Sequence, residues 1–297
     1  MRYEFLTTTK INEYVTAISG VCGEKAYLFE GKDAAVLFDG LTGVGSLKEL
    51  VKTLTDLPVT MVLSHAHPDH CGAAFEYGAC YMHPDDIELL YIDAANGEDA
   101  RFSFATTPVP YLKMAKPVIT MEDMIYSRPI KTYPVYDGDT FELGGLTLTV
   151  VELPGHTRGS IMLLDQARGD LYAGDAINPS TLLHIAGATT VEEYKEGLLH
   201  LKERQNDFIR VYSGHSTQPM PNSVVDDALW VCDRILSGTD DAVPEISPLG
   251  NGLRACKVGV NYMPLYGGFA NIVYNKDWIW GNKKPKVTQK GLFIKEV

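Results

Sequence analysis

Residues 59–70 read Val-Thr-Met-Val-Leu-Ser-His-Ala-His-Pro-Asp-His. The apolar run Val59–Leu63 is typical of a short buried strand, and Ser64 ends it. Three imidazoles and one carboxylate follow within six positions: His65, His67, Asp69 and His70. On a regular strand, residues i and i+2 share a face that residue i+5 does not, so a loop is needed to turn all four side chains inward. Imidazole nitrogen and carboxylate oxygen are donors that zinc accepts, and the stretch therefore predicts a metal site at the end of a strand.

A lone histidine near a strand end is usually a surface or core residue whose ring nitrogens form ordinary hydrogen bonds. Several rings of this kind beside one carboxylate are costly to crowd together unless a metal organises them. No cysteine belongs to the cluster, which argues against a closed structural zinc site.

The sequence around this cluster alternates strands, loops and helices. Residues 24–31 and 34–40 predict a strand hairpin, residues 45–54 a helix, and residues 84–91 a helix that begins at Pro84. Further strands are expected at 140–153, 160–164, 170–173 and 209–213, and further helices at 191–204 and 224–236, the last ended by Gly238.

Three more histidine or aspartate motifs follow the first cluster in the chain. They read Pro154-Gly155-His156-Thr157 with Gly159-Ser160, Ala173-Gly174-Asp175, and Ser213-Gly214-His215. Each has a glycine directly before the candidate ligand, where a glycine would let the chain turn sharply. Together with His65, His67, Asp69 and His70, this order and spacing resembles the metallo-β-lactamase superfamily over about residues 20–216, and its glyoxalase II and lactonase-like branch in particular.

The resemblance implies an α/β fold, a four-layer αββα sandwich of two mixed sheets with helices outside. It also implies a centre of two divalent metal ions. By position, the first ion would take His65, His67 and His156, the second Asp69, His70 and His215, and Asp175 would bridge them. Zinc is the expected metal, with iron and manganese as alternatives.

The implied activity is hydrolysis of an ester-type bond, in a thioester, a lactone or a related small substrate, by a hydroxide that the two metal ions share. Asp69 would also orient this hydroxide and shuttle a proton, and is the candidate catalytic residue. A phosphodiesterase or nuclease of the same fold, a β-lactamase-like amide hydrolase and a non-catalytic metal-binding protein remain alternatives. The bridging Asp175 favours the thioesterase, lactonase and phosphodiesterase-like branches over true β-lactamases. The lactonases have a tyrosine three residues after that aspartate, where this chain has Asn178.

Three further residues are weaker candidates for a role beside the metals or the substrate. Asp39 follows an apolar strand and is either a carboxylate behind a metal-binding histidine or a turn cap. Asn178 could donate a hydrogen bond to an oxyanion, and His184 lies in a loop after Asp175 and could contact the substrate. Cys71 follows His70 and is expected to be core packing.

Length and composition set the frame for this interpretation. We expect the 297 residues to form one domain, with insertions at about 96–136 and 244–268 as cleft walls or a lid. Aromatic residues in these insertions suggest a small, partly apolar substrate, with a dimer interface or core packing as the alternative: Phe102, Phe104, Tyr111, Tyr262, Tyr266 and Phe269.

Charge and targeting signals limit the partners. A formal net charge of −12 disfavours nucleic acid and anionic membranes as partners. The first 15 residues lack the pattern of a secretory signal, and the five scattered cysteines are typical of reduced thiols, so we expect a cytoplasmic protein. A small-molecule substrate is expected, and a homodimer is left open.

Overall fold

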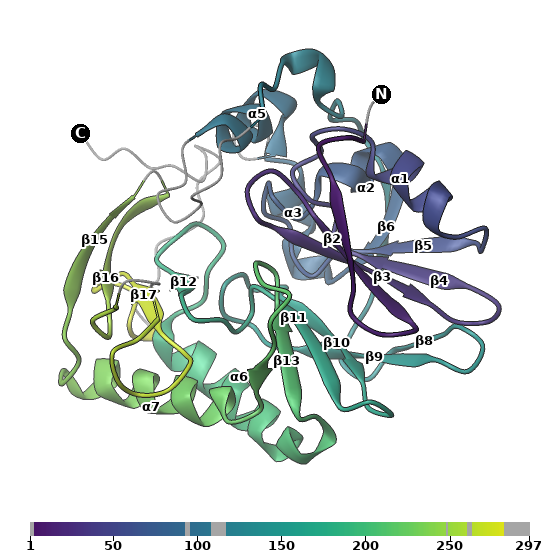
Figure 1. Ribbon diagram of the computed structural model, residues 1–297. Coiled ribbons are helices and arrows are strands. Elements are labelled where there is room, and N and C mark those ends of the chain that lie inside the picture. Colours follow the sequence, from purple (N-terminus) through teal and green to yellow (C-terminus); the bar gives the residue numbers. More distant parts are fainter. Residues whose placement is uncertain (1–2, 93–95, 108–116, 248, 260–262, 282–297) are drawn as a thin grey trace. The chain divides into compact units, whose positions relative to one another are not determined.

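The computed structural model describes residues 3–92, 96–107, 117–247, 249–259 and 263–281 (Figure 1). The chain divides into two compact units. The first comprises residues 1–150 and 214–218, and the second comprises residues 151–213 and 219–297. The chain passes from the first unit to the second within strand β9 and returns for five residues that include His215. The single domain expected from the sequence stays a prediction.

The first unit contains a seven-stranded sheet with the strands in chain order, β1 to β7. Its strands are β1 (Thr7–Lys10), β2 (Val15–Ser19), β3 (Lys25–Glu30), β4 (Ala35–Phe38), β5 (Val59–Val62), β6 (Ala79–Met82) and β7 (Lys131–Pro134). The first four are antiparallel, and β4 to β7 are parallel. Every residue of β4 is buried, as expected for a strand with both faces covered. Because β4 and β5 are parallel, Asp39 and Ser64 follow neighbouring strands at the same edge.

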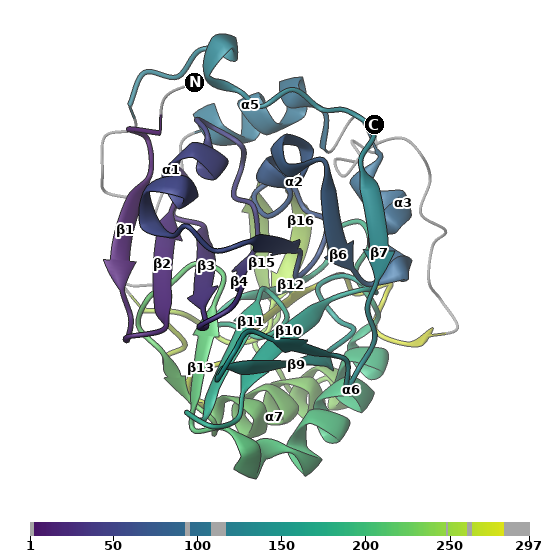
Figure 2. The ribbon, with the colours of Figure 1, turned by 90° about the vertical axis from the view of Figure 1, so that its right-hand side faces the viewer.

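The helices of the first unit are short. They are α1 (Leu47–Leu54), α2 (Gly72–Tyr77), the 3-10 helix η1 (Pro84–Asp86), α3 (Ile87–Leu90), α5 (Glu98–Thr106) and the 3-10 helix η2 (Met121–Asp123). Ser46 caps α1 by accepting a hydrogen bond from the Glu49 backbone N–H at 3.0 Å. Helices α1 and α2 lie next to each other on one face of the sheet (Figure 2). The unit ends with the predicted hairpin of β8 (Thr140–Glu142) and β9 (Thr147–Glu152).

In the second unit, two long helices cover one face of a sheet. The strands β14 (Met220–Pro221), β13 (Arg210–Ser213), β11 (Asp170–Gly174) and β10 (Ile161–Asp165) are neighbours in that order. The helices α6 (Val191–Glu203) and α7 (Val224–Ser237) pack side by side (Figure 1). Alternate strand residues such as Met162, Leu164 and Leu171 join Leu198 and Val231 of the helices in one apolar core.

The second unit also has a small sheet that the sequence did not predict. Its strands, in order, are β12 (Thr181–Leu183), β17 (Ile272–Tyr274), β16 (Gly250–Arg254) and β15 (Val243–Ser247). Part of the expected insertion at 244–268 is therefore a regular β-hairpin, β15 with β16. Its strand β16 pairs with β17, which in turn pairs in parallel with β12.

The expected insertion at 96–136 contains its own apolar cluster. Buried Ala105, Ile119 and Met124 pack with residues of the N-terminal half of the unit, and Phe102 and Phe104 lie partly buried against them. Tyr266 and Phe269 of the other insertion are 39% and 40% exposed. Tyr111 and Tyr262 lie outside the described residues.

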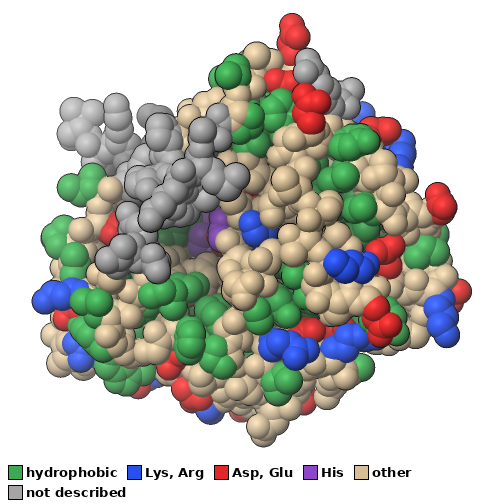
Figure 3. Space-filling view, viewed as in Figure 1, with side chains coloured by type: hydrophobic (Ala, Val, Ile, Leu, Met, Phe, Trp, Pro, Cys, Tyr) green, Lys and Arg blue, Asp and Glu red, His purple; other side chains and the backbone are tan. Residues whose placement is uncertain are grey.

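The surface mixes charges of both signs. On the face drawn in Figure 3, basic and acidic side chains are interspersed over the described residues. Within the same described ranges, no helix combines the length and the apolar composition that crossing a bilayer requires.

Candidate metal centre

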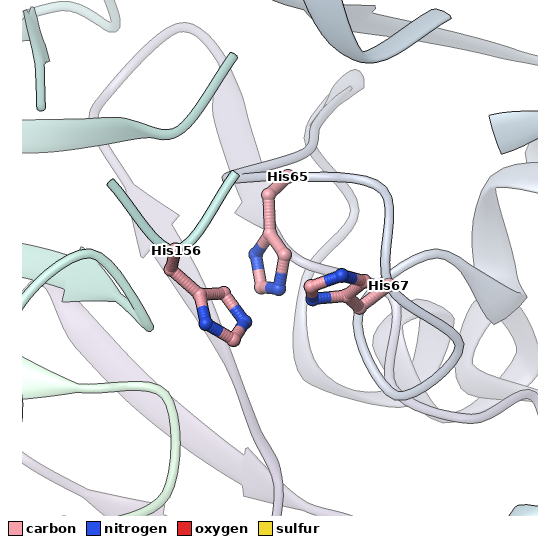
Figure 4. A group of neighbouring side chains, drawn as sticks. All are labelled: His65, His67 and His156. Atoms are coloured by element: carbon pink, nitrogen blue, oxygen red, sulfur yellow. The ribbon is translucent and has the colours of Figure 1, made fainter. Parts of the chain in front are cut away.

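The loop after β5 carries a tight group of imidazoles. His65, His67 and His70 are 1%, 4% and 0% exposed. The ring centroids of His65 and His67 are 4.7 Å apart in an edge-to-face arrangement, and those of His65 and His70 are 4.3 Å apart. Figure 4 shows His65 and His67 projecting from this loop. The structure thus brings together the three histidines that the sequence places within six positions.

Asp39 orients two of these histidines, His70 by direct contact and His65 through Ser64. Its Oδ2 atom lies 2.9 Å from His70 Nδ1. The same carboxylate accepts hydrogen bonds from the Ser64 backbone N–H at 2.7 Å and from Ser64 Oγ at 2.9 Å, and Ser64 Oγ is 2.9 Å from His65 Nδ1. Because the Nδ1 atoms of both rings face this network, their Nε2 atoms are directed to the opposite side. Asp39 has a left-handed φ of 71°, a conformation that is strained for a residue other than glycine.

His215 joins the loop through the short segment 214–218. The segment is anchored by the Lys25 backbone N–H, which donates to Gly214 O at 2.7 Å, and by the Tyr27 hydroxyl, which donates to Ser216 O at 3.0 Å. Asp69 Oδ2 is 3.5 Å from His215 Nε2 and 3.7 Å from His70 Nε2. One ligand atom from each of Asp69, His70 and His215 fits within 4.8 Å, the spacing of a metal site. The His215 side chain is 31% exposed, so this group has an open side.

Two buried residues that the sequence analysis missed hold the loop at Ala66. The Ala66 backbone N–H donates to Asp86 Oδ2 at 3.0 Å, and Asn96 Nδ2 donates to Ala66 O at 2.8 Å. Arg101 in turn donates to Asn96 O at 2.9 Å and to Thr42 O at 2.8 Å. No local sequence signal marks Asp86 or Asn96, because each lies 20 residues or more after Ala66.

In the second unit, His156 and Asp175 follow the ends of β9 and β11. His156 is labelled in Figure 4. Its Nε2 atom is 3.7 Å from Asp175 Oδ2, and its Nδ1 atom is 3.0 Å from Leu182 O. That second contact fixes the ring orientation, as a backbone carbonyl commonly does for a metal-binding histidine. Both side chains are buried, with 2% and 8% exposure.

The glycines before the ligands act in different ways. Gly174 has a φ of 49° and marks a register shift in the pairing of β11 with β13, so it turns the chain as predicted. Gly155 lies in a bend and Gly214 in a turn, as predicted, but neither has a positive φ. At Gly155 the reason for glycine is contact instead, because a Cβ atom would lie 2.2 Å from Tyr194 Cδ2.

The weaker candidates are placed as follows. Asn178 is 8% exposed and its Oδ1 atom accepts a hydrogen bond from the Ser180 backbone N–H at 2.7 Å. His184 is 6% exposed and lies against Gly252, whose added Cβ would be 3.0 Å from the ring. Burial lowers the pKa of His184 to about 4, which keeps its ring neutral. Cys71 is fully buried, burial raises the pKa of its thiol to about 12, and it packs in the core.

The donors in both units suit a metal ion. All are imidazole nitrogens or carboxylate oxygens, which are ligands that zinc and other borderline divalent ions accept. Imidazole binds a metal ion in its neutral form. The loop after β5 and its return segment therefore form a site that a cation fits.

Comparison with known proteins agrees with this chemistry. The family model described as "Metallo-beta-lactamase superfamily" matches residues 19–215. The chain belongs to this superfamily. It is accordingly a metal-dependent hydrolase of the metallo-β-lactamase type, as the motifs predicted.

Two named relatives match part of the chain. The human protein named acyl-coenzyme A thioesterase MBLAC2 is 29% identical over 199 residues, which are 60% of this chain and 68% of the relative. The Haemophilus influenzae protein named hydroxyacylglutathione hydrolase GloC is 23% identical over 151 residues, 49% of this chain and 62% of the relative.

Solved structures share the fold. A metallo-β-lactamase from Pontibacter korlensis superposes with a TM-score of 0.53 at 17% identity, over 77% of this chain and 99% of that one. One from Erythrobacter litoralis gives a TM-score of 0.56 at 16% identity, over 79% and 99%. The predicted fold class, a mixed α/β fold of the metallo-β-lactamase type, is confirmed.

Proposed function

We propose that this protein is a dinuclear metallo-hydrolase that cleaves thioesters. The observation that carries the proposal is the group of Asp69, His70 and His215, held from behind by Asp39. The proposed ligands are His65, His67, His156, Asp69, His70, Asp175 and His215.

The number of donors supports two ions rather than one. Zinc in a catalytic site takes three protein ligands and keeps one position for water or substrate. Seven donors exceed what one such ion uses. The inclusion of His156 and Asp175 with the ligands of the first unit follows from the order of the family motifs. Zinc is our first choice of metal, and iron and manganese are the alternatives.

Different residues have different roles in the proposed hydrolysis. Bound divalent ions supply Lewis acidity and lower the pKa of water to about 7. The Asp69 carboxylate, within 3.7 Å of two ligand rings, orients the attacking water and accepts its proton. Asp39 keeps the His70 ring in one orientation while this proton moves.

A thioester is the substrate class that the relatives support. One is named for hydrolysis of acyl-coenzyme A and the other for hydrolysis of hydroxyacylglutathione. In such a reaction water adds to the acyl carbon, the C–S bond breaks, and a carboxylic acid and a thiol form. Because a thiol has a pKa of about 8.5, it departs as thiolate without a strong general acid on the leaving side.

The test is a substrate panel on the purified full chain with its metal content measured. The panel contains acetyl- and palmitoyl-coenzyme A, lactoylglutathione, a lactone, a β-lactam and a phosphodiester. We expect about two ions per chain and the highest kcat/KM on a thioester. Asp69→Ala should lower kcat by at least about 100-fold, in the range of lost acid and base catalysis.

Each alternative function predicts a different result of the substrate panel or the metal analysis. A phosphodiester or β-lactam cleaved faster than every thioester would replace the proposed substrate class. Two bound metals without turnover of any panel member would favour a non-catalytic metal-binding protein. One ion per chain at saturating zinc would contradict the dinuclear centre.

A further inference from the structure

Tyr194 of α6 is a fully buried phenol of the second unit that contacts both loops carrying candidate ligands. It is 0% exposed and is among the largest fully buried side chains of the described residues. The start of α6 is fixed by a capping box, in which Thr190 and Glu193 exchange hydrogen bonds. Tyr194 therefore projects from a well-anchored first turn.

The ring of Tyr194 lies against the loop that precedes His156. A Cβ atom added to Gly155 would meet Cδ2 of this ring at 2.2 Å and Cε2 at 2.7 Å, closer than carbon atoms pack. The backbone of Gly155 therefore rests directly on the ring. The same glycine is tied to the start of α6 by the Thr189 backbone N–H, which donates to Gly155 O at 2.8 Å.

The hydroxyl of Tyr194 reaches the other loop. It donates a hydrogen bond of 2.8 Å to Ala176 O, and Ala176 directly follows Asp175. Burial raises the pKa of this phenol, with a smaller opposite influence from the Thr181 side chain, so the hydroxyl keeps its proton and remains a donor.

Tyr194 also lies near the strand whose carbonyl orients His156. Thr181, the side chain that influences the phenol, begins β12. The next residue is Leu182, whose carbonyl oxygen is 3.0 Å from His156 Nδ1. One rigid side chain thus contacts the segment before His156 and the segment after Asp175.

We propose that Tyr194 is a positioning residue that holds the His156 and Asp175 loops together, so that His156 Nε2 and Asp175 Oδ2 stay at the observed 3.7 Å. The inference rests on the proposed assignment of these two residues as metal ligands. It predicts that the phenol tunes metal binding without touching metal or substrate.

Tyr194→Phe tests this role because it keeps the ring and removes only the hydroxyl. The matched control is Tyr274→Phe, which removes the hydroxyl of a buried tyrosine in the same unit; this hydroxyl donates to Asp240 Oδ2 at 2.8 Å, outside the candidate ligands. Zinc affinity is measured by competition with a chelator. The geometry of the site is measured by visible absorption of the Co²⁺-loaded proteins. Thermal unfolding of both metal-free variants reports the common cost of a lost hydrogen bond.

We expect Tyr194→Phe to bind zinc about tenfold more weakly than the wild type, in the range seen when a group behind a ligand is removed. Its Co²⁺ spectrum should change, whereas that of Tyr274→Phe should not. Zinc affinities of the two variants within twofold of each other, with unchanged spectra, would overturn the inference.

A second variant approaches the same contact from the loop. Gly155→Ala leaves the hydroxyl in place and pushes a methyl group against the ring. If Tyr194→Phe does not fold, the zinc affinity and Co²⁺ spectrum of Gly155→Ala are compared with those of Tyr274→Phe instead. Because the readouts are metal binding and spectra, they are separate from the substrate panel. A wild type that binds metal but hydrolyses no thioester would refute the proposed function and leave the test of Tyr194 valid.

Discussion

Asp39 and His70 form a buried hydrogen-bonded pair, with 2.9 Å between Asp39 Oδ2 and His70 Nδ1. Neither side chain is more than 1% exposed. Water cannot easily replace either partner. The pair connects the end of β4 with the candidate ligands after β5, so the orientation of a candidate metal ligand depends on a residue 31 positions earlier in the chain. Of the two sequence interpretations of Asp39, the carboxylate behind a histidine agrees with this contact.

Asp39→Asn should weaken metal binding while the fold is kept. An amide can still accept from the Ser64 backbone N–H, but it holds the His70 ring less firmly than a carboxylate does. We expect zinc affinity to fall by about 10- to 100-fold. A chelator competition titration of the purified variant measures it. Asp165→Asn is the control, because Asp165 is equally buried but pairs with Arg168 in the second unit. Equal zinc affinities for the two variants would show that Asp39 is only a turn residue.

Metal removal should lower stability as well as activity. A ligand that binds only the folded state at a free concentration 1,000 times its Kd stabilises that state by about 4.1 kcal/mol. We expect each zinc ion to raise the unfolding free energy of the wild type by about this amount at that concentration. His70→Ala with one site weakened a hundredfold would gain only about 1.4 kcal/mol from that site under the same conditions. The exposed His200 on α6 supplies the control, since His200→Ala should respond to zinc as the wild type does. A zinc response of His70→Ala equal to that of the wild type would remove His70 from the ligand set.

Local patterns in the sequence were sufficient for the long elements and the candidate ligands. Strands β3, β4 and β5 and helices α1, α6 and α7 lie within one or two residues of the predicted ranges. Each has a clear apolar run or apolar periodicity, and the ligand motifs consist of rare combinations of residues. Such features are readable without knowledge of the rest of the fold.

Elements that depend on distant partners were not predictable. Strand β1 is exposed at all four residues and carries no apolar pattern, and β12 and β17 have three residues each. They exist because neighbouring strands complete their hydrogen bonds. The roles of Asp86 and Asn96 were not predictable for the same reason, since they depend on Ala66 and not on neighbours in sequence.

Arg101 should be essential for the stability of the first unit. It is fully buried, burial lowers its pKa, and it donates to the carbonyl oxygens of Asn96, Thr42 and Ile125. Arg101→Met would leave these acceptors without their donor, and each unsatisfied buried group costs about 1–3 kcal/mol. We expect a loss of at least about 3 kcal/mol in urea denaturation. Arg158→Met, which breaks an exposed pair with Glu193, should cost no more than about 1 kcal/mol. Similar losses for both variants would contradict a special role of Arg101.

His184 should make the metal-free protein less stable in acid. Burial lowers its pKa in the folded state to about 4, from 6.5 in the unfolded chain. The unfolded state therefore binds more protons between these two values, and the unfolding free energy falls as the pH drops through this window. Between pH 7 and pH 5 this one group accounts for a loss of about 2 kcal/mol. His184→Leu removes the titrating ring, so its unfolding free energy should decline by about 2 kcal/mol less than that of the wild type over the same range. Urea denaturation of both metal-free proteins at the two pH values measures the difference, and His200→Ala serves as the exposed control. An identical decline in wild type and His184→Leu would mean that the ring gains its proton in the folded protein as easily as in water.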